Sequence, residues 1–161
     1  MPKVVSNTTP IISLLKLNRI DLFEKLYNEL YIPIAVFNEI EAGKDKIYYK
    51  DLSEIDWIKI VEIENKLSVK YFLDLDSGEA EAIVLATELN ADLIIIDEKL
   101  GRYHAKNADL KVIGTIGVLL KAKKEGLIFA IKPLLDELTE NNVWISEKFK
   151  RDILVQIGED Y

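Results

Sequence analysis

Blocks of apolar residues recur along this chain, and two adjacent blocks in its middle have the clearest pattern. Asp92-Leu-Ile-Ile-Ile-Asp97 holds a run of aliphatic residues between two acids. Such a run predicts a strand buried on both faces, as in a parallel sheet covered by helices. Residues 80–89, just before it, are apolar on nearly every side. This pattern is typical of a helix that is buried on more than one face.

The ends of this central helix carry recognisable signals. Asp76 followed by Glu79 is a capping-box pattern, with Ser77 as an alternative cap, and Asn90 suits the left-handed position that ends a helix. Glu79 would then lie in the first helical turn and Asp97 just beyond the carboxyl end of the buried strand. Ligands of open α/β sheets bind outside that end. Both acids also have a structural explanation, because acids favour helix N-termini and Asp often begins a turn.

The rest of the chain continues this alternation of strands and helices. Further strands are predicted at residues 3–6, 30–33, 57–61 (an edge strand), 111–114 and 144–145. Further helices are predicted from a Thr9 cap to residue 17, over 20–28, from Pro33 to Gly43, over the polar residues 44–53, over 99–107 in irregular form, from a Thr115 cap to residue 125, over 131–140, and from a Ser146 cap to residue 157. The pattern predicts one domain, residues 1–161, folded as a three-layer α/β/α sandwich around a mostly parallel sheet.

The amino-acid composition limits the kinds of metal site and partner that the chain can have. Hydrophobic residues make up 49% of the chain and charged residues 30%, which indicates a globular protein. The chain has no Cys and one His, which excludes the usual zinc sites, so a metal would need oxygen ligands and would be Mg²⁺ or Mn²⁺. The net charge of −7 argues against a broad non-specific nucleic-acid footprint. Without cysteines, a signal-peptide core or a membrane-length apolar run, the chain is expected to be cytoplasmic, with no membrane partner.

Several enzyme classes lack their motifs. No glycine-rich phosphate loop follows the first strand, and no G-x-S-x-G elbow is present. His104 has polar neighbours and is expected at the surface rather than as a general base. A phosphoacceptor domain would need an acidic pair where this chain has Ser6-Asn7.

Acids and one amide remain as candidates for a site. If the first strand, the strand at 93 and the strand at 112 are neighbours, their carboxyl ends bring Asn7, Asp97 and Thr115 to one edge. Glu39 and Glu79 can reach that edge from the flanking helices.

Five short segments follow one another in a specific order and spacing: VVSNTTPII (4–12), IPIAVFNE (32–39), GEAEAI (78–83), IIIDE (94–98) and VIGTIGVL (112–119). Through them the chain resembles the PIN-domain family over nearly its whole length, and within it the prokaryotic proteins related to VapC-type toxins.

This resemblance implies a metal-dependent endoribonuclease that cuts RNA, plausibly the toxin of a toxin–antitoxin pair. Its catalytic and metal-binding residues would be Asn7, Glu39, Glu79 and Asp97, with Glu81 and Glu98 as assistants. These side chains would hold Mg²⁺ or Mn²⁺, which activates water and neutralises charge on the phosphate. The resemblance also implies a homodimer and, for a toxin, a small antitoxin protein as partner.

One residue departs from the family pattern. Asn7 stands where the family usually has Asp. An amide oxygen can bind a hard cation but brings no charge, so metal affinity should fall. The alternative function is therefore a weak or inactive PIN-fold module that binds RNA or a protein, and Asn7 could also be a purely structural turn residue.

The last third of the chain holds more apolar residues than one sheet face needs. They either cover the sheet or form an interface between two copies of the chain. The residues in question are Leu134, Leu135, Leu138, Trp144, Ile145, Phe149 and Ile153.

Overall fold

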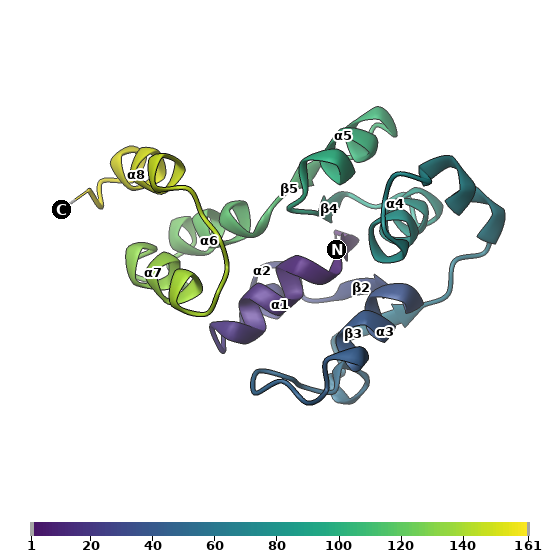
Figure 1. The fold of residues 1–161 in the computed structure, drawn as a ribbon, viewed down its shortest axis with the longest axis horizontal. Coiled ribbons are helices and arrows are strands. Elements are labelled where there is room, and N and C mark those ends of the chain that lie inside the picture. Colours follow the sequence, from purple (N-terminus) through teal and green to yellow (C-terminus); the bar gives the residue numbers. More distant parts are fainter. Residues whose placement is uncertain (1, 161) are drawn as a thin grey trace.

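A five-stranded sheet forms the middle layer of the protein, and helices cover both of its faces (Figure 1). The structure is a computed structural model and describes residues 2–160. All strand pairs are parallel, in the order β3-β2-β1-β4-β5. This confirms the predicted three-layer α/β/α fold and the edge position of the strand after Trp57. The strands are β1 (Val4–Ser6), β2 (Leu30–Pro33), β3 (Ile58–Val61), β4 (Leu93–Ile95) and β5 (Val112–Ile113).

Each strand sends alternate side chains into two separate cores. Val4 and Ile95 pack into one core, and Val5 and Ile94 pack into the other, as the two-residue period of a strand requires. The first core is covered by α1 (Thr8–Lys16), α2 (Asp21–Tyr27), α3 (Ile34–Ala42), α6 (Thr115–Lys124), α7 (Lys132–Glu140) and α8 (Glu147–Gln156). The second core is covered by α4 (Ser77–Glu88), α5 (Lys99–Asn107) and the 3-10 helix η2 (Lys66–Phe72).

The central helix forms as its sequence predicts. Asp76 is the N-cap of α4, and its Oδ1 accepts a hydrogen bond from the backbone N–H of Glu79 at 2.8 Å. Asn90 follows the helix with a φ of +51°, a left-handed conformation that Asn tolerates better than most residues. The body of α4 is buried on several sides because it packs against the sheet, α3 and α5.

Two predicted caps lie earlier in the chain, by two residues for α1 and by one residue for α6. α1 begins at Thr8 with Asn7 as its N-cap, where Thr9 was predicted, and α6 begins at Thr115 with Gly114 as its N-cap, where Thr115 was predicted. Only Asn7 separates the end of β1 from the start of α1, so α1 begins before Thr9 can act as its cap. The hydroxyl of Thr115 is used elsewhere, as described below.

Three other local predictions differ from the structure. Residues 44–53 form turns and the start of the 3-10 helix η1 (Leu52–Glu54) rather than a helix, although Tyr48, Tyr49 and Leu52 of this segment pack into the first core. Residues 144–145 form no strand, and the Trp144 side chain is exposed. Helix η2 was not predicted, whereas α5 is regular and has the predicted bounds.

The order of the strands creates a switch point. The chain moves outward from β1 to β2 and β3, then returns to the other side of β1 to form β4 and β5. β1 and β4 therefore lie side by side, and their connections leave in opposite directions. In open α/β sheets ligands bind at such a place, outside the carboxyl ends of the strands.

The predicted excess of apolar residues near the C-terminus is largely core. Leu135, Leu138 and Ile153 are buried, whereas Trp144 and Phe149 remain exposed. Of the helices within residues 2–160, none has the length and apolar composition needed to cross a membrane.

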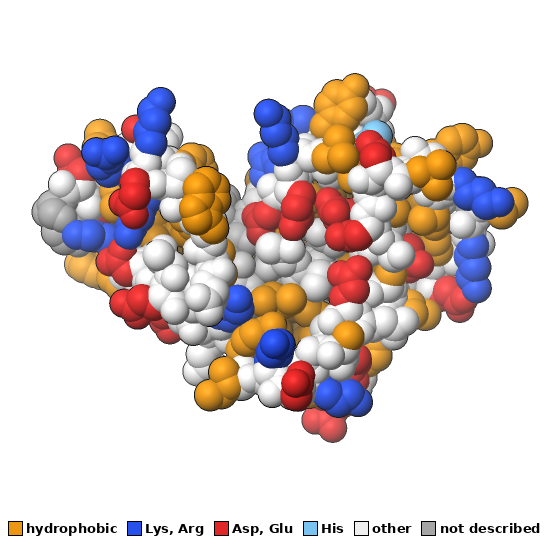
Figure 2. Space-filling view, viewed as in Figure 1, with side chains coloured by type: hydrophobic (Ala, Val, Ile, Leu, Met, Phe, Trp, Pro, Cys, Tyr) orange, Lys and Arg blue, Asp and Glu red, His pale blue; other side chains and the backbone are white. Residues whose placement is uncertain are grey.

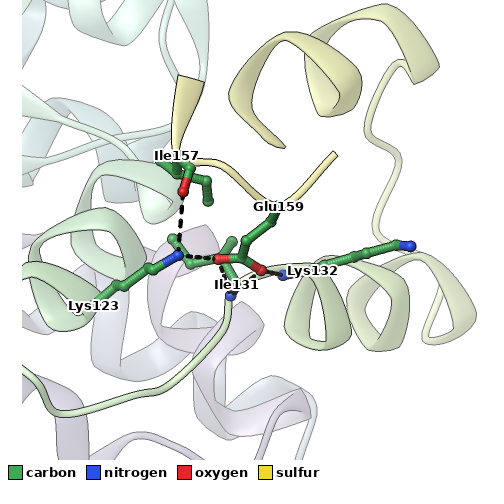
Figure 3. Close-up of polar contacts among 5 residues, drawn as sticks. All are labelled: Lys123, Ile131, Lys132, Ile157 and Glu159. Atoms are coloured by element: carbon green, nitrogen blue, oxygen red, sulfur yellow. Dashed lines mark hydrogen bonds and ion pairs between the residues drawn. The ribbon is translucent and has the colours of Figure 1, made fainter. Parts of the chain in front are cut away.

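The end of the chain is tied to the body by a buried carboxylate (Figure 3). Glu159 is 4% exposed and accepts hydrogen bonds from the backbone N–H groups of Ile131 and Lys132, at the start of α7. Lys123 of α6 donates its ammonium to the same carboxylate and to the carbonyl of Ile157. Burial by itself would raise the pKa of Glu159, but these donors outweigh burial and hold the pKa below its usual value. The contact fixes α8 between α6 and α7.

We predict that Glu159→Gln lowers the free energy of unfolding by about 1.5–3 kcal/mol at pH 7, the range for hydrogen bonds to a charged group. Urea denaturation measures this loss. Because the pKa of Glu159 is lowered in the folded state, its contribution is present at neutral pH and disappears as the pH falls through that pKa. Asp160→Asn, which removes the neighbouring exposed charge, is the control and should leave stability unchanged. Equal stability of the two variants at pH 7 would contradict the prediction.

Candidate functional site

Polar and acidic side chains gather at the carboxyl ends of β1 and β4. Asn7 follows β1 directly, and Asp97 and Glu98 follow β4. Glu39 comes from α3 and Glu79 from the first turn of α4. Figure 2 shows several acidic side chains near the middle of this face, over β4 and the neighbouring helix ends.

Asn7 is held by the sheet and leaves one oxygen unpaired. Its backbone N–H donates to the carbonyl of Ile95 at 3.0 Å, which extends the pairing of β1 with β4. The side chain is 2% exposed, and its Nδ2 lies 3.4 Å from an oxygen of Glu98. Its Oδ1 is buried and has no hydrogen-bond partner among the described residues. A buried amide oxygen without a donor is costly unless something else binds it.

Glu39 is oriented by two donors. The Thr8 hydroxyl donates to its Oε2, and the backbone N–H of Gly78 donates to its Oε1 at 3.0 Å. A Cβ on Gly78 would lie 2.6 Å from that Oε1, so only glycine lets the start of α4 approach this closely. Burial raises the pKa of Glu39, and the nearby carboxylates of Asp76 and Glu98 raise it further.

Glu79 is the acid most affected by its surroundings. Its side chain is 7% exposed, and its buried Oε2 has no hydrogen-bond partner among the residues described. That oxygen faces Gly101, where a Cβ would lie only 2.6 Å away. Burial, followed by the adjacent carboxylates of Asp76 and Glu98, raises the pKa of Glu79 to about 7. A bound cation would offset both the cost of burying the ionised Glu79 carboxylate and its repulsion from the neighbouring carboxylates.

Asp97 is engaged in a different contact. Its Oδ1 accepts a hydrogen bond from the backbone N–H of Thr115 at 2.6 Å, and its Oδ2 accepts one from the Thr115 hydroxyl at 2.7 Å. These bonds place the carboxylate at the N-terminus of α6, where the helix dipole favours an anion. Gly114 leaves room for it, because a Cβ there would lie 2.7 Å from Oδ1. Asp97 thus anchors the start of α6 at the rim of the cluster.

Asp76 and Glu98 are part of the acidic cluster, although the sequence predicted neither of them as a main site residue. Asp76 shows only a capping pattern, and Glu98 is only a predicted assistant, yet their carboxylates are the two that raise the pKa values of both Glu39 and Glu79. Glu98 also accepts a hydrogen bond from the Thr9 hydroxyl at 2.8 Å. The other predicted assistant, Glu81, instead accepts a hydrogen bond from the backbone N–H of Ala35 in the first turn of α3, at 3.1 Å.

The donor set suits a hard divalent cation. Every candidate ligand is an oxygen, and the unpaired oxygens of Asn7 and Glu79 are the kind of atom that a bound Mg²⁺ or Mn²⁺ would satisfy. Within residues 2–160, no group of three or more Asp, Glu or His side chains is placed so that it could hold a metal ion as it stands. Binding a cation here would therefore require these side chains to move closer together.

The chain was compared with known families and proteins. The family model "DUF3368: PIN domain" matches residues 3–159, a range that includes every strand and every acid of the cluster. No curated protein matches the chain.

The raised pKa of Glu79 predicts a pH-dependent cost to stability in the absence of metal. Below the usual pKa of 4.5 the carboxyl is protonated in both folded and unfolded chains, so it has no effect. As the pH rises to about 7, the unfolded chain loses this proton first and stability falls. In EDTA at pH 8, Glu79→Gln should therefore have a higher Tm than the unchanged protein, by roughly 2–4 °C for each kcal/mol recovered.

Differential scanning calorimetry at pH 5 and pH 8 measures this difference, which should shrink at the lower pH. Glu140→Gln, at the exposed end of α7, is the matched control and should show no gain. A Tm for Glu79→Gln at or below that of the control at pH 8 would show that ionised Glu79 is not destabilising.

Proposed function

The chain belongs to the PIN-domain family, and on this basis we propose that it is a metal-dependent endoribonuclease. The observation that carries the proposal is that the carboxylates of Glu39 and Glu79 both feel that of Glu98, which Asn7 contacts, while Asn7 and Glu79 each keep a buried oxygen unpaired among the described residues. Holding like charges together in a partly buried place costs stability, and a divalent cation offsets that cost.

We propose Asn7, Glu39, Glu79 and Glu98 as the ligands of Mg²⁺ or Mn²⁺. A bound cation of this kind supplies positive charge beside the scissile phosphate and acidifies the attacking water. Thr8 and Thr9 orient two of the carboxylates through their hydroxyls. Asp97, the fourth ligand predicted from the sequence, accepts one hydrogen bond on each oxygen, as Glu39 and Glu98 do, and each oxygen keeps a second lone pair. Asp97 therefore stays a predicted ligand.

The second candidate function is a weak or inactive module that binds RNA or a protein partner. The neutral amide of Asn7 favours it, because the cluster has one negative charge fewer than it would have with Asp at this position. The finer proposals are the toxin of a toxin–antitoxin pair, neutralised by a small antitoxin protein, and a homodimer. The resemblance to VapC-type proteins supports the toxin role and the homodimer.

We predict that Asn7→Asp strengthens Mn²⁺ binding by roughly 10-fold, about 1.4 kcal/mol, because it adds a charge to the ligand set. Isothermal titration calorimetry measures this. The matched control is Asn90→Asp, which adds the same charge at the opposite end of α4 from Glu79. The metal-free Asn7→Asp protein should also be less stable, since Asp cannot donate to Glu98. Equal or weaker Mn²⁺ binding than in the control would show that Asn7 is not a ligand.

We also predict that the protein cuts single-stranded RNA in Mg²⁺ or Mn²⁺ and not in EDTA. Glu39→Gln should lower the rate by roughly 100-fold or more, about 2.7 kcal/mol of transition-state stabilisation, whereas Glu140→Gln should not change it. A gel assay with an end-labelled RNA follows the reaction. Cleavage that survives equally in Glu39→Gln points to a contaminating nuclease. No cleavage by the unchanged protein or by Asn7→Asp would favour the second candidate function.

A further inference from the structure

A groove of about 860 Å³ opens beside Asp97. Its floor comes from α1, the β4–α5 connection and the start of α6, and its outer wall comes from the segment before α8 and from α8 itself. Figure 2 shows the molecule hollowed between this end and the body that carries the sheet. The volume is in the range of small-ligand sites. The lining includes Thr9, Ser13, Asp97, Lys99, Trp144 and Phe149.

The lining of the groove combines exposed aromatic rings with polar and charged side chains. The outer wall presents two aromatic rings, Trp144 at 85% exposed and Phe149 at 50% exposed. The floor presents the half-buried Thr9 and the carboxylate of Asp97, and the exposed Lys99 adds a positive charge. A purely apolar protein segment would cover these polar groups without replacing their hydrogen bonds to water, at a cost. A nucleobase suits them better, because it has an apolar face for stacking and a polar edge for hydrogen bonds.

The aromatic wall is built to stay in place. The N–H of Val143 donates to the carbonyl of Leu138 at 2.9 Å, and the Ser146 hydroxyl caps α8 by accepting from the N–H of Phe149 at 3.1 Å. Glu159 holds the other end of α8 against α6 and α7 (Figure 3). Trp144 is thus exposed on a backbone fixed on both sides, which reduces the conformational entropy that this segment would lose on binding a ligand.

The groove is continuous with the acidic cluster. Thr9 lines the groove and donates its hydroxyl to Glu98, while Asp97 lies at the border of both. A phosphate held at the cluster would therefore carry its neighbouring nucleotide toward Trp144, with Lys99 available for the next phosphate.

We propose that this groove takes a base of single-stranded RNA, stacked on Trp144, next to the phosphate at the cluster. The class of ligand rests on the proposed ribonuclease function. Stacking on an exposed aromatic side chain gives sequence-tolerant binding of an unpaired strand, and a base paired within a duplex cannot offer its face in this way. Trp144 is then a binding residue that selects unpaired RNA.

The test measures binding separately from cleavage. The chain has two tryptophans, so a Trp57→Phe background makes Trp144 the only one. The probe is a short 2′-O-methyl RNA strand, added in Ca²⁺, a hard cation that oxygen ligands accept. Its bases should quench Trp144 fluorescence, and an abasic strand of the same length and charge should not.

Affinity is compared in a second experiment, by fluorescence anisotropy of the labelled strand, with proteins that keep Trp57. Trp144→Ala should weaken binding by roughly 5- to 150-fold, the range for one base–aromatic stack. Phe129→Ala is the matched control, since Phe129 is 95% exposed and lies outside the groove lining, and it should have no effect. Thermal unfolding confirms that each variant is folded.

Equal quenching by the base-containing and abasic strands overturns the proposal, and so does equal affinity of Trp144→Ala and Phe129→Ala. Light scattering that shows a dimer for the unchanged chain and a monomer for Trp144→Ala, without base-dependent quenching, also overturns it and assigns the wall to a contact between copies. If RNA is not cut in Mg²⁺ or Mn²⁺ but the base-dependent quenching persists, the catalytic proposal fails and the groove proposal stands.

Discussion

The parallel pairing of β1 with β4 is the contact on which the candidate site depends. Its register places Ser6 opposite Ile95, and the N–H of Asn7 extends it by one more bond to the Ile95 carbonyl. The chain therefore leaves both strands at the same point, and the amide of Asn7 meets Glu98 there. A slip of one residue would turn the side chain of Asn7 to the other face and exchange the two cores.

The acids at this edge are kept in place by small residues and by hydroxyls. Gly78, Gly101 and Gly114 each leave room for one carboxylate, those of Glu39, Glu79 and Asp97 respectively. Thr8, Thr9 and Thr115 donate to Glu39, Glu98 and Asp97. This support fixes the direction of each side chain without adding positive charge. The fold thus retains a local repulsion that lowers its own stability, a common property of sites arranged for binding or catalysis.

The C-terminal helices α7 and α8 are held firmly against the rest of the protein. Leu135, Leu138 and Ile153 attach them to the core, and Glu159 closes the contact between the tail, α6 and α7. The wall that carries Trp144 is therefore part of the rigid structure, although its aromatic ring is exposed. A buried ion pair with additional backbone donors is well suited to this role, because removing either partner leaves an uncompensated group.

The sequence by itself determined the elements and the edge at which the acids meet. Runs such as Leu93–Ile95 and the all-round apolar α4 predict a buried parallel sheet, and Asp76 and Asn90 mark the ends of that helix, because these signals act within a few residues. Only the tertiary structure decided which side chains contact one another. It pairs Asp97 with Thr115, 18 residues away, brings Asp76 and Glu98 beside Glu39 and Glu79, and leaves residues 144–145 outside the sheet. Such choices depend on which side chains the packed layers bring within hydrogen-bond distance, and no local pattern records that.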